Sequence, residues 1–373
     1  MSSRPYSGSM VWKIIVLVTT FLPALLGSNS CPTACQCSEP ARTVKCVLQD
    51  LEEVPSPIPT YTRNLFITGN HIYKIRANAF QGLDNLHNLS LANNRIVLLE
   101  PEAFASLPNL RFLDLSNNRL AKVHPNAFIA ENNSIQELNL NRAFYNSSVI
   151  RDIAAVLHSG GFLQLSKLDM ASNELIYLPL GIFSHLPALR HLDLKNNSII
   201  DLKNSTFCGL DLEFLDLSAN AFKNLRVDVL NELSRQKHLC IQLKDNPFFC
   251  NCEIEDFAEW LNSSEVVLNA NKLVCAYPKD MQNVSLLMLS EMELGCHSSE
   301  NTEIVLQTSY VLLGIVVGFV GIIFLFVMYL NRKEIKTWIY NMRDACRDLM
   351  EGYHYRYEID SDPRVTQVST SDV

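Results

Sequence analysis

The sequence predicts an α/β solenoid, a curved repeat domain with disulfide-bonded caps at both ends, followed by one transmembrane helix. Three observations predict this fold. A short leucine-rich pattern recurs about every 24 residues, cysteines cluster before and after the repeats, and a long uncharged apolar run lies near the C-terminus. A single turn of such a solenoid cannot bury its apolar face alone, so the stacking of turns forms the core.

The pattern L-x-L-x-x-N recurs along the middle of the chain. Its asparagines advance by 24, 24, 55, 24, 23 and 26 residues, at Asn70, Asn94, Asn118, Asn173, Asn197, Asn220 and Asn246. This is the period of leucine-rich repeats. In each unit two apolar residues of a short strand point inward, and the asparagine bonds the backbone of the neighbouring turn. We therefore expect a curved leucine-rich-repeat ectodomain with about eight repeats over residues 61–246.

The interval of 55 residues contains one degenerate repeat and an insert. Leu138 and Leu140 keep the leucine pattern, but Ala143 takes the place of the asparagine. An insert of roughly six residues relative to two regular repeats falls within residues 144–161. Because it contains two glycines and a glycosylation motif, we expect a surface loop that divides the solenoid into two runs.

Cysteines mark the two caps, which we place at residues 31–60 and 247–297. The front cap holds Cys31, Cys35, Cys37 and Cys46, and the back cap holds Cys250, Cys252, Cys275 and Cys296. Spacing alone leaves three pairings open for each set of four. Zinc binding is the alternative for closely spaced cysteines, but a secreted, oxidising context disfavours it.

Cys208 and Cys240 lie outside both caps. The even number of cysteines before the membrane span favours a fifth bridge between them. The repeat register opposes it, because it places Cys208 near the turn after the convex side and Cys240 on the strand side. A disulfide requires the Cα atoms to lie within about 7 Å. A bridge and two free surface thiols both remain open.

Two apolar segments set the topology. Residues 1–30 have the form of a secretory signal peptide. Residues 311–330 carry no charge and are long enough to cross a bilayer, after a juxtamembrane linker at residues 298–310. Arg332 and Lys333 follow directly, and positive charge stays on the cytoplasmic side. We expect a single-pass plasma-membrane protein with an extracellular N-terminus and a cytoplasmic tail at residues 331–373.

Composition restricts the function. The net charge of −8 and the absence of a basic stripe in the ectodomain argue against nucleic-acid binding. The chain has no H-E-x-x-H, G-x-S-x-G or P-loop motif, so we expect no enzymatic activity, no cofactor, no metal and no small-molecule substrate. All seven N-x-S/T motifs precede the apolar run, which predicts N-glycosylation at Asn88, Asn132, Asn146, Asn196, Asn204, Asn262 and Asn283.

From Cys31 through the tail, the chain resembles the trophoblast glycoprotein family, also called the Wnt-activated inhibitory factor family. The resemblance rests on residues 41–46 (ARTVKC), 63–66 (RNLF), 68–70 (TGN), 275–278 (CAYP), 329–333 (YLNRK), 343–348 (RDACRD) and 350–359 (MEGYHYRYEI). It implies an inhibitor of β-catenin-dependent Wnt signalling that acts at the plasma membrane on the lipoprotein-receptor-related Wnt co-receptor. The extra pair Cys208 and Cys240 and the short central insert depart from the family pattern.

The resemblance of both ends to leucine-rich-repeat caps implies the disulfide pairing. The expected bridges are Cys31–Cys37, Cys35–Cys46, Cys250–Cys275 and Cys252–Cys296.

The tail is too short for a kinase or a Toll-type signalling domain, so its role is recruitment. Its last residues, Ser371, Asp372 and Val373, fit the C-terminal form that PDZ domains bind, and the family resemblance supports a PDZ-domain adaptor as partner.

The alternation of strand residues predicts which side chains face the concave side. Lys45 and Phe66 come from neighbouring layers and should face the same concave edge, where exposed aromatic residues act as interface anchors. The alternatives are a Phe66 packed on the cap and an ordinarily solvated Lys45. Phe112 is outward by register. Tyr277 lies in the back cap, either as a contact or packed over the Cys250 bridge.

Four aspartates, Asp114, Asp169, Asp193 and Asp216, form a column across successive turns of the concave face. The column would suit a basic patch on a partner. Consensus repeats often carry aspartate at this position, so the pattern also fits a structural role.

A second function class fits the same architecture. An adhesion molecule or synaptic organiser shares the caps, the repeats, the membrane span and the PDZ-type terminus. Clustering of expressing cells whatever their Wnt state would indicate adhesion.

Overall fold

The computed structural model describes residues 30–129, 133–159, 161–292 and 300–361. The chain divides into two compact units, residues 1–294 and 295–373. The expected signal peptide, apart from Ser30, and the residues Asn132, Cys296, Ser371, Asp372 and Val373 lie outside the described residues.

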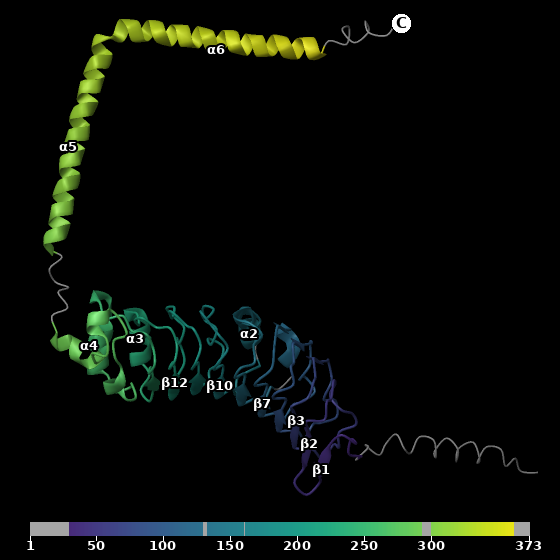
Figure 1. Cartoon of the computed structure of the whole chain (residues 1–373). Coiled ribbons are helices and arrows are strands. Elements are labelled where there is room, and N and C mark those ends of the chain that lie inside the picture. The colour runs from purple at the N-terminus through teal and green to yellow at the C-terminus, as the bar shows by residue number, and fades with distance from the viewer. Residues whose placement is uncertain (1–29, 130–132, 160, 293–299, 362–373) are drawn as a thin grey trace, which may run out of the picture. The chain divides into compact units, whose positions relative to one another are not determined.

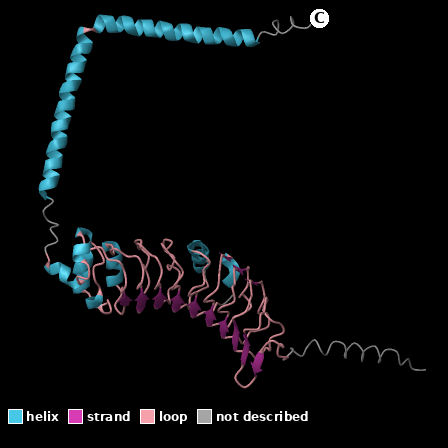
Figure 2. Ribbon diagram, viewed as in Figure 1, coloured by secondary structure: helices cyan, strands magenta, loops and turns pink. Residues whose placement is uncertain are grey.

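A ten-stranded sheet lines one side of the first unit (Figure 2). Its strands, in spatial order, are β1 (Gln36–Ser38), β2 (Thr43–Val47), β3 (Asn64–Thr68), β5 (Asn88–Ser90), β7 (Phe112–Asp114), β9 (Glu137–Asn139), β10 (Lys167–Asp169), β11 (His191–Asp193), β12 (Phe214–Asp216) and β13 (Cys240–Gln242). Only β1 pairs antiparallel; the other strands are parallel, one per turn of the chain. The first unit is therefore the expected solenoid, and its row of strands curves.

Short strands and helices form the opposite side of the solenoid (Figure 1). A three-stranded parallel sheet contains β4 (Lys74–Ile75), β6 (Leu98–Leu99) and β8 (Lys122–Val123). Among the described residues of this unit, the α-helices are α2 (Ile150–His158), α3 (Val227–Ser234) and α4 (Glu255–Ser263). The 3-10 helices are η2 (Pro125–Phe128), η3 (Ser147–Val149), η4 (Cys252–Ile254), η5 (Ala270–Lys272), η6 (Lys279–Met281) and η7 (Leu286–Glu291).

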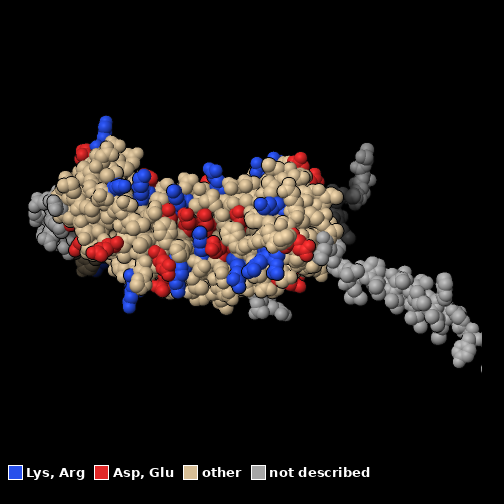
Figure 3. Space-filling model, turned by 90° about the horizontal axis from the view of Figure 1, so that it is seen from below, with Lys and Arg blue, Asp and Glu red and all other residues tan. Residues whose placement is uncertain are grey.

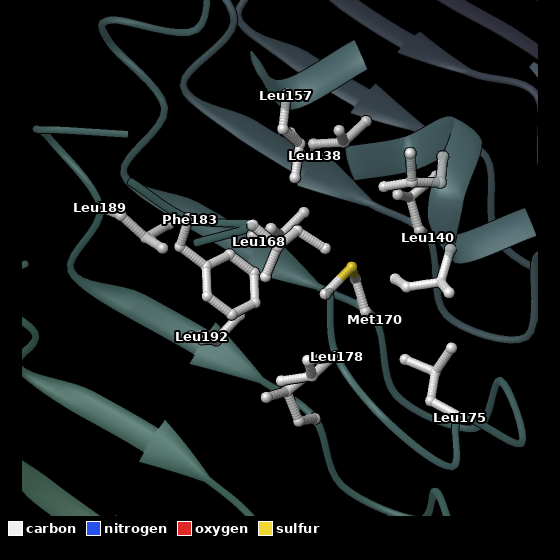
Figure 4. Close-up of a cluster of buried hydrophobic side chains, with 14 of the residues drawn as sticks. Leu138, Leu140, Leu157, Leu168, Met170, Leu175, Leu178, Phe183, Leu189 and Leu192 are labelled. Atoms are coloured by element: carbon white, nitrogen blue, oxygen red, sulfur yellow. The ribbon is translucent and has the colours of Figure 1, made fainter. Parts of the chain in front are cut away.

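Successive turns stack equivalent apolar side chains to form one core. The central leucine of each regular strand is inaccessible to solvent, as at Leu65, Leu89 and Leu113. On the far side of the core, Phe80, Phe104, Phe128 and Phe162 form a row with ring centroids 5.9, 5.0 and 5.5 Å apart. Figure 4 shows the same arrangement in the middle of the solenoid, where Leu138, Leu168 and Leu192 come from successive strands.

A ladder of buried asparagines joins each turn to the next. The Asn118 side-chain oxygen accepts hydrogen bonds from the backbone N–H groups of Asn94 (3.1 Å) and Ile96 (2.9 Å). Its nitrogen donates to the carbonyls of Leu91 (3.0 Å) and Leu115 (2.7 Å). Equivalent asparagines repeat this pattern at Asn70, Asn94, Asn173, Asn197, Asn220 and Asn246. The predicted asparagine role is confirmed.

The central insert forms a helix, so the expected surface loop was wrong. Helix α2 buries Ile150, Ile153, Ala154 and Leu157, which recur at the spacing of one helical face. In Figure 4, Leu157 lies beside Leu138 of the degenerate repeat. This apolar spacing anchors the insert to the core, and its glycines lie beyond the helix. At Ala143 the ladder lacks an asparagine, and the backbone carbonyl of Ala143 accepts from Leu120 N–H at 2.8 Å instead.

Three of the four expected cap disulfides are formed. The bridges Cys31–Cys37, Cys35–Cys46 and Cys250–Cys275 have Cα separations of 5.9, 4.3 and 5.7 Å. Cys252 is also disulfide-bonded, whereas its expected partner Cys296 lies outside the described residues.

The possible fifth bridge, Cys208–Cys240, is not formed. Both thiols are free and exposed. Cys240 begins strand β13 on the sheet side, whereas Cys208 lies in the turn that follows the buried Phe207. The repeat register therefore decides against the bridge that the even cysteine count favoured.

The second unit contains two long helices, α5 (Glu300–Leu330) and α6 (Arg332–Ser361). Within α5, Leu312–Leu330 is long and apolar enough to cross a membrane. The stretch expected to be the juxtamembrane linker, residues 298–310, is helical from Glu300. Residues 300–310 contain few helix breakers, so the helix extends upstream of the apolar run.

Replacing Asn118 with alanine is expected to lower the free energy of unfolding by about 1 to 3 kcal/mol, because buried backbone groups lose their partners. Chemical denaturation of the secreted ectodomain measures this loss, and the secreted yield should fall with it. Arg119→Ala changes the adjacent exposed side chain and is the matched control. An Asn118→Ala ectodomain that is secreted and unfolds like the parent contradicts the role of the ladder.

Candidate protein-binding face

The parallel register arranges the outward side chains of the large sheet in columns. Lys45 lies beside Phe66, Phe66 beside Ser90 and Ser90 beside Asp114. The same column continues through Asn139, Asp169, Asp193, Asp216 and Gln242. A parallel column contains Thr43, Asn64, Asn88, Phe112, Glu137, Lys167, His191, Phe214 and Cys240.

Lys45 and Phe66 meet at the N-terminal edge of this face. The Lys45 ammonium nitrogen lies 6.0 Å from the centroid of the Phe66 ring, at the limit of a cation–π contact. Lys45 is exposed and Phe66 is half-buried, while Val44, Cys46 and Ile67 beside them point into the core. The structure thus places both side chains outward on neighbouring strands, as the alternation predicts.

The other two candidates lie apart from this pair. Phe112 is half-buried and belongs to the second column, on the second strand beyond Phe66 in the sheet. Tyr277 is 58% exposed and lies in the C-terminal cap, where its carbonyl accepts a 2.7 Å hydrogen bond from Cys250 N–H. The four residues therefore do not form one site, and only Lys45 and Phe66 are neighbours.

A polar ladder beside the Lys45–Phe66 pair was not predicted. The Asn88 amide nitrogen donates to the Asn64 side-chain oxygen at 2.6 Å, and the Asn64 nitrogen donates to the Thr43 hydroxyl at 3.2 Å. The asparagines at equivalent strand positions could have indicated this ladder, because their spacing of 24 residues matches the repeat.

The column of aspartates has a structural explanation. One carboxylate oxygen of each aspartate accepts a hydrogen bond from the backbone N–H two residues later, which ends the strand in a turn. The distances are 3.0, 2.9, 2.9 and 2.8 Å at Asp114, Asp169, Asp193 and Asp216. Asn139 makes the same bond to Asn141 N–H at 2.9 Å without a charge. The turn therefore requires an oxygen acceptor but not a carboxylate.

The aspartates nevertheless give the strand face an acidic centre (Figure 3). The pKa of Asp193 is raised above its ordinary value, chiefly because burial disfavours the charged form. The neighbouring carboxylates Asp169 and Asp216 add to the rise, whereas the backbone N–H of Lys195 and the Lys195 charge oppose it. The carboxylates thus repel one another in a partly desolvated surface.

Comparisons with known proteins identify the architecture. The leucine rich repeat family model matches residues 60–120 and 164–222. Trophoblast glycoprotein of Macaca fascicularis is 46% identical over 360 residues, which cover 92% of this chain and 85% of that protein. Trophoblast glycoprotein of Mus musculus is 44% identical over 367 residues, with coverage of 92% and 86%. The chain belongs to the trophoblast glycoprotein family.

A solved structure of this family agrees with the fold. The crystal structure of human 5T4, also named Wnt-activated inhibitory factor 1 or trophoblast glycoprotein, is 41% identical to the chain with a TM-score of 0.65. The match covers 69% of this chain and 96% of the human chain. The proteins of this family are leucine-rich-repeat glycoproteins.

Most predicted glycosylation sites of this family member are exposed. Asn146, Asn196, Asn204, Asn262 and Asn283 all lie at the surface. Asn88 differs, because it is half-buried on the sheet face. We propose that the five exposed asparagines carry glycans, and glycopeptide mass spectrometry tests each one.

Replacing Asp193 with asparagine is expected to stabilise the ectodomain at neutral pH. The folded chain holds the Asp193 proton more tightly than the unfolded chain, because its folded pKa exceeds the ordinary 3.8. Ionisation therefore costs stability above the folded pKa, and this cost disappears as the pH falls below 3.8.

Melting temperatures of parent and variant from neutral to acidic pH check this expectation. The gain should be present at neutral pH and vanish in acid, while the turn persists because asparagine supplies the same acceptor, as Asn139 does. Asp280→Asn removes an exposed carboxylate in the C-terminal cap and should give no comparable gain. A gain for Asp193→Asn that is the same at all pH values contradicts this explanation.

Proposed function

We propose that this chain inhibits β-catenin-dependent Wnt signalling at the plasma membrane by acting on the lipoprotein-receptor-related Wnt co-receptor. Membership of the trophoblast glycoprotein family supports the proposal, together with the name Wnt-activated inhibitory factor 1 given to the human relative. The observation that carries the residue assignment is the contact of Lys45 with Phe66 on the concave edge.

This pair has the properties of an interface anchor. A half-buried aromatic ring offers apolar surface with little loss of conformational freedom on binding. A cation beside it can pair with a carboxylate of a partner while its aliphatic stem covers the ring. On the described strands, the Lys45 column is otherwise polar or acidic from Ser90 through Gln242, so the pair is chemically distinct within that column. Phe112 and Tyr277 are proposed as secondary contacts only.

We further propose a type I orientation, with the repeats outside and the tail inside the cell. The basic residues Arg332, Lys333 and Lys336 directly after the apolar span support it, because such residues stay cytoplasmic. The C-terminal Ser371, Asp372 and Val373 are proposed to bind a PDZ-domain adaptor. Cell-surface antibody labelling of an N-terminal epitope without permeabilisation tests the orientation.

Lys45→Ala and Phe66→Ala are each expected to weaken Wnt inhibition while secretion and melting stay nearly unchanged. Truncation of an anchor residue costs about 2 kcal/mol or more of binding free energy, which corresponds to an affinity loss of about thirtyfold. A Wnt reporter assay at matched surface level measures the effect.

Lys122→Ala on β8 is the control, because Lys122 is an exposed lysine on the convex side. A sharp fall in secretion for Phe66→Ala would mean that the Phe66 ring packs against the N-terminal cap and is needed for folding. Full inhibition by Lys45→Ala would show that this edge is not the partner site. Aggregation of expressing cells independent of Wnt, with no effect on the reporter, would favour the adhesion alternative.

Deletion of residues 341–373 should leave both surface display and Wnt inhibition intact. Arg332, Lys333 and Lys336 remain to hold the topology. Flow cytometry and the reporter assay measure the two properties in the same cells, and the ectodomain released without its span shows whether the anchor is required. Lost inhibition at an unchanged surface level would assign the effector role to the tail.

A further inference from the structure

Helix α6 has an exposed apolar face over the part in which its side chains are described, residues 332–347. This tail apolar face consists of Ile335, Trp338, Ile339, Met342 and Cys346. Trp338, Ile339 and Met342 are 62%, 53% and 43% exposed. At about 100° per residue, all five side chains fall within an arc of about 100°. The spacing is thus that of an amphipathic helix.

Basic residues flank this face on one side. Between Arg332 and Arg347 the helix contains five basic and two acidic residues. On a helical projection, Arg332, Lys336, Arg343 and Arg347 occupy the arc next to the apolar side chains. Arg343 and Arg347 lie 3.8 and 3.6 Å from the Asp344 carboxylate, which is a solvent-exposed contact of little strength.

The connection to the apolar span determines what this face meets. Only Asn331 separates the end of the candidate span at Leu330 from the start of α6 at Arg332. The helix is therefore held at the bilayer surface at a high local concentration of lipid. Basic residues beside a membrane span are attracted to the anionic lipids of the cytoplasmic leaflet, and tryptophan favours the headgroup region.

We propose that the first half of α6 lies along the cytoplasmic surface of the bilayer, with the tail apolar face in the headgroup boundary and the basic flank toward anionic lipids. This inference rests on the orientation proposed above. It gives the chain a second membrane contact of the interfacial type, which is reversible and sensitive to lipid charge. It also predicts that Cys346 lies at the lipid boundary rather than in the cytosol.

Cys346 reports on this arrangement directly. The test uses the full-length chain with Cys208→Ser and Cys240→Ser, because these are the other free and exposed thiols of the described residues. The protein is reconstituted with its tail outward in vesicles of phosphatidylcholine alone or of a roughly four-to-one mixture with phosphatidylserine. The measured quantity is the rate at which a charged, water-soluble maleimide alkylates Cys346.

Alkylation should be severalfold slower in the phosphatidylserine vesicles than in phosphatidylcholine alone. Ile339→Glu places a charge in the apolar face and should restore the fast rate. Thr337→Glu adds the same charge on the opposite side of the helix and should leave the slow rate unchanged. Combined Lys336→Gln and Arg343→Gln should remove the difference between the two lipids.

The proposal is overturned if Cys346 is alkylated fast in both lipids and Ile339→Glu does not change the rate. Protection that occurs in cell membranes but not in purified vesicles also overturns it, because a soluble protein then covers the face. These measurements do not depend on Wnt signalling, so their failure leaves the proposed function untouched. Alkylation of Cys346 from outside intact cells would instead overturn the orientation.

Discussion

The hydrogen bonds of the buried asparagine side chains are the constraint on which the solenoid depends. The asparagine oxygen and nitrogen bond backbone groups of their own turn and of the neighbouring turn. Asn118, for example, accepts from Asn94 and Ile96 and donates to Leu91 and Leu115. The turn spacing fixed in this way aligns the strands, and strand alignment sets the columns of the concave face. At Ala143 a backbone carbonyl replaces the side chain, and this exception coincides with the insert that contains α2.

The sequence predicted those features that a repeated local pattern determines. The repeats, the inward leucines and the outward positions of Lys45 and Phe66 follow from periods of two and of about 24 residues. The pairing of the cap cysteines instead followed from the resemblance to leucine-rich-repeat caps. Helix α2 was missed because its apolar spacing at Ile150, Ile153 and Leu157 interrupts the repeat, and two adjacent glycines suggested a loop. For Cys208 and Cys240, the even number of cysteines favoured a bridge, whereas the repeat register placed the two residues on different sides of the solenoid. The two thiols are free, as the register indicated.

The candidate site was predictable in position but less so in its surroundings. Alternation along β2 and β3 places Lys45 and Phe66 outward, yet only the packed structure gives their 6.0 Å separation and the degree to which Phe66 is buried. Phe112 and Tyr277 are aromatic like Phe66 but lie apart from the Lys45–Phe66 pair. The sequence could not predict this separation, because the pattern around a single residue carries no information on distances across several turns. The Asn64–Asn88 hydrogen bond likewise depends on side-chain rotamers that sequence spacing does not specify.

Charge is distributed unevenly along the concave face, from one end of the solenoid to the other. Its Lys45 column begins with a cation and an aromatic ring and continues into carboxylates at Asp114, Asp169, Asp193 and Asp216. The uncharged Asn139 closes its turn as well as the aspartates do, so the turns do not account for the negative charge. Burial and mutual repulsion raise the pKa of Asp193, which means that the charge opposes folding at neutral pH. The two ends of one column therefore differ in what they contribute. The Asp193 carboxylate lowers stability at neutral pH, whereas Lys45 lies 6.0 Å from the Phe66 ring at the edge proposed for partner binding.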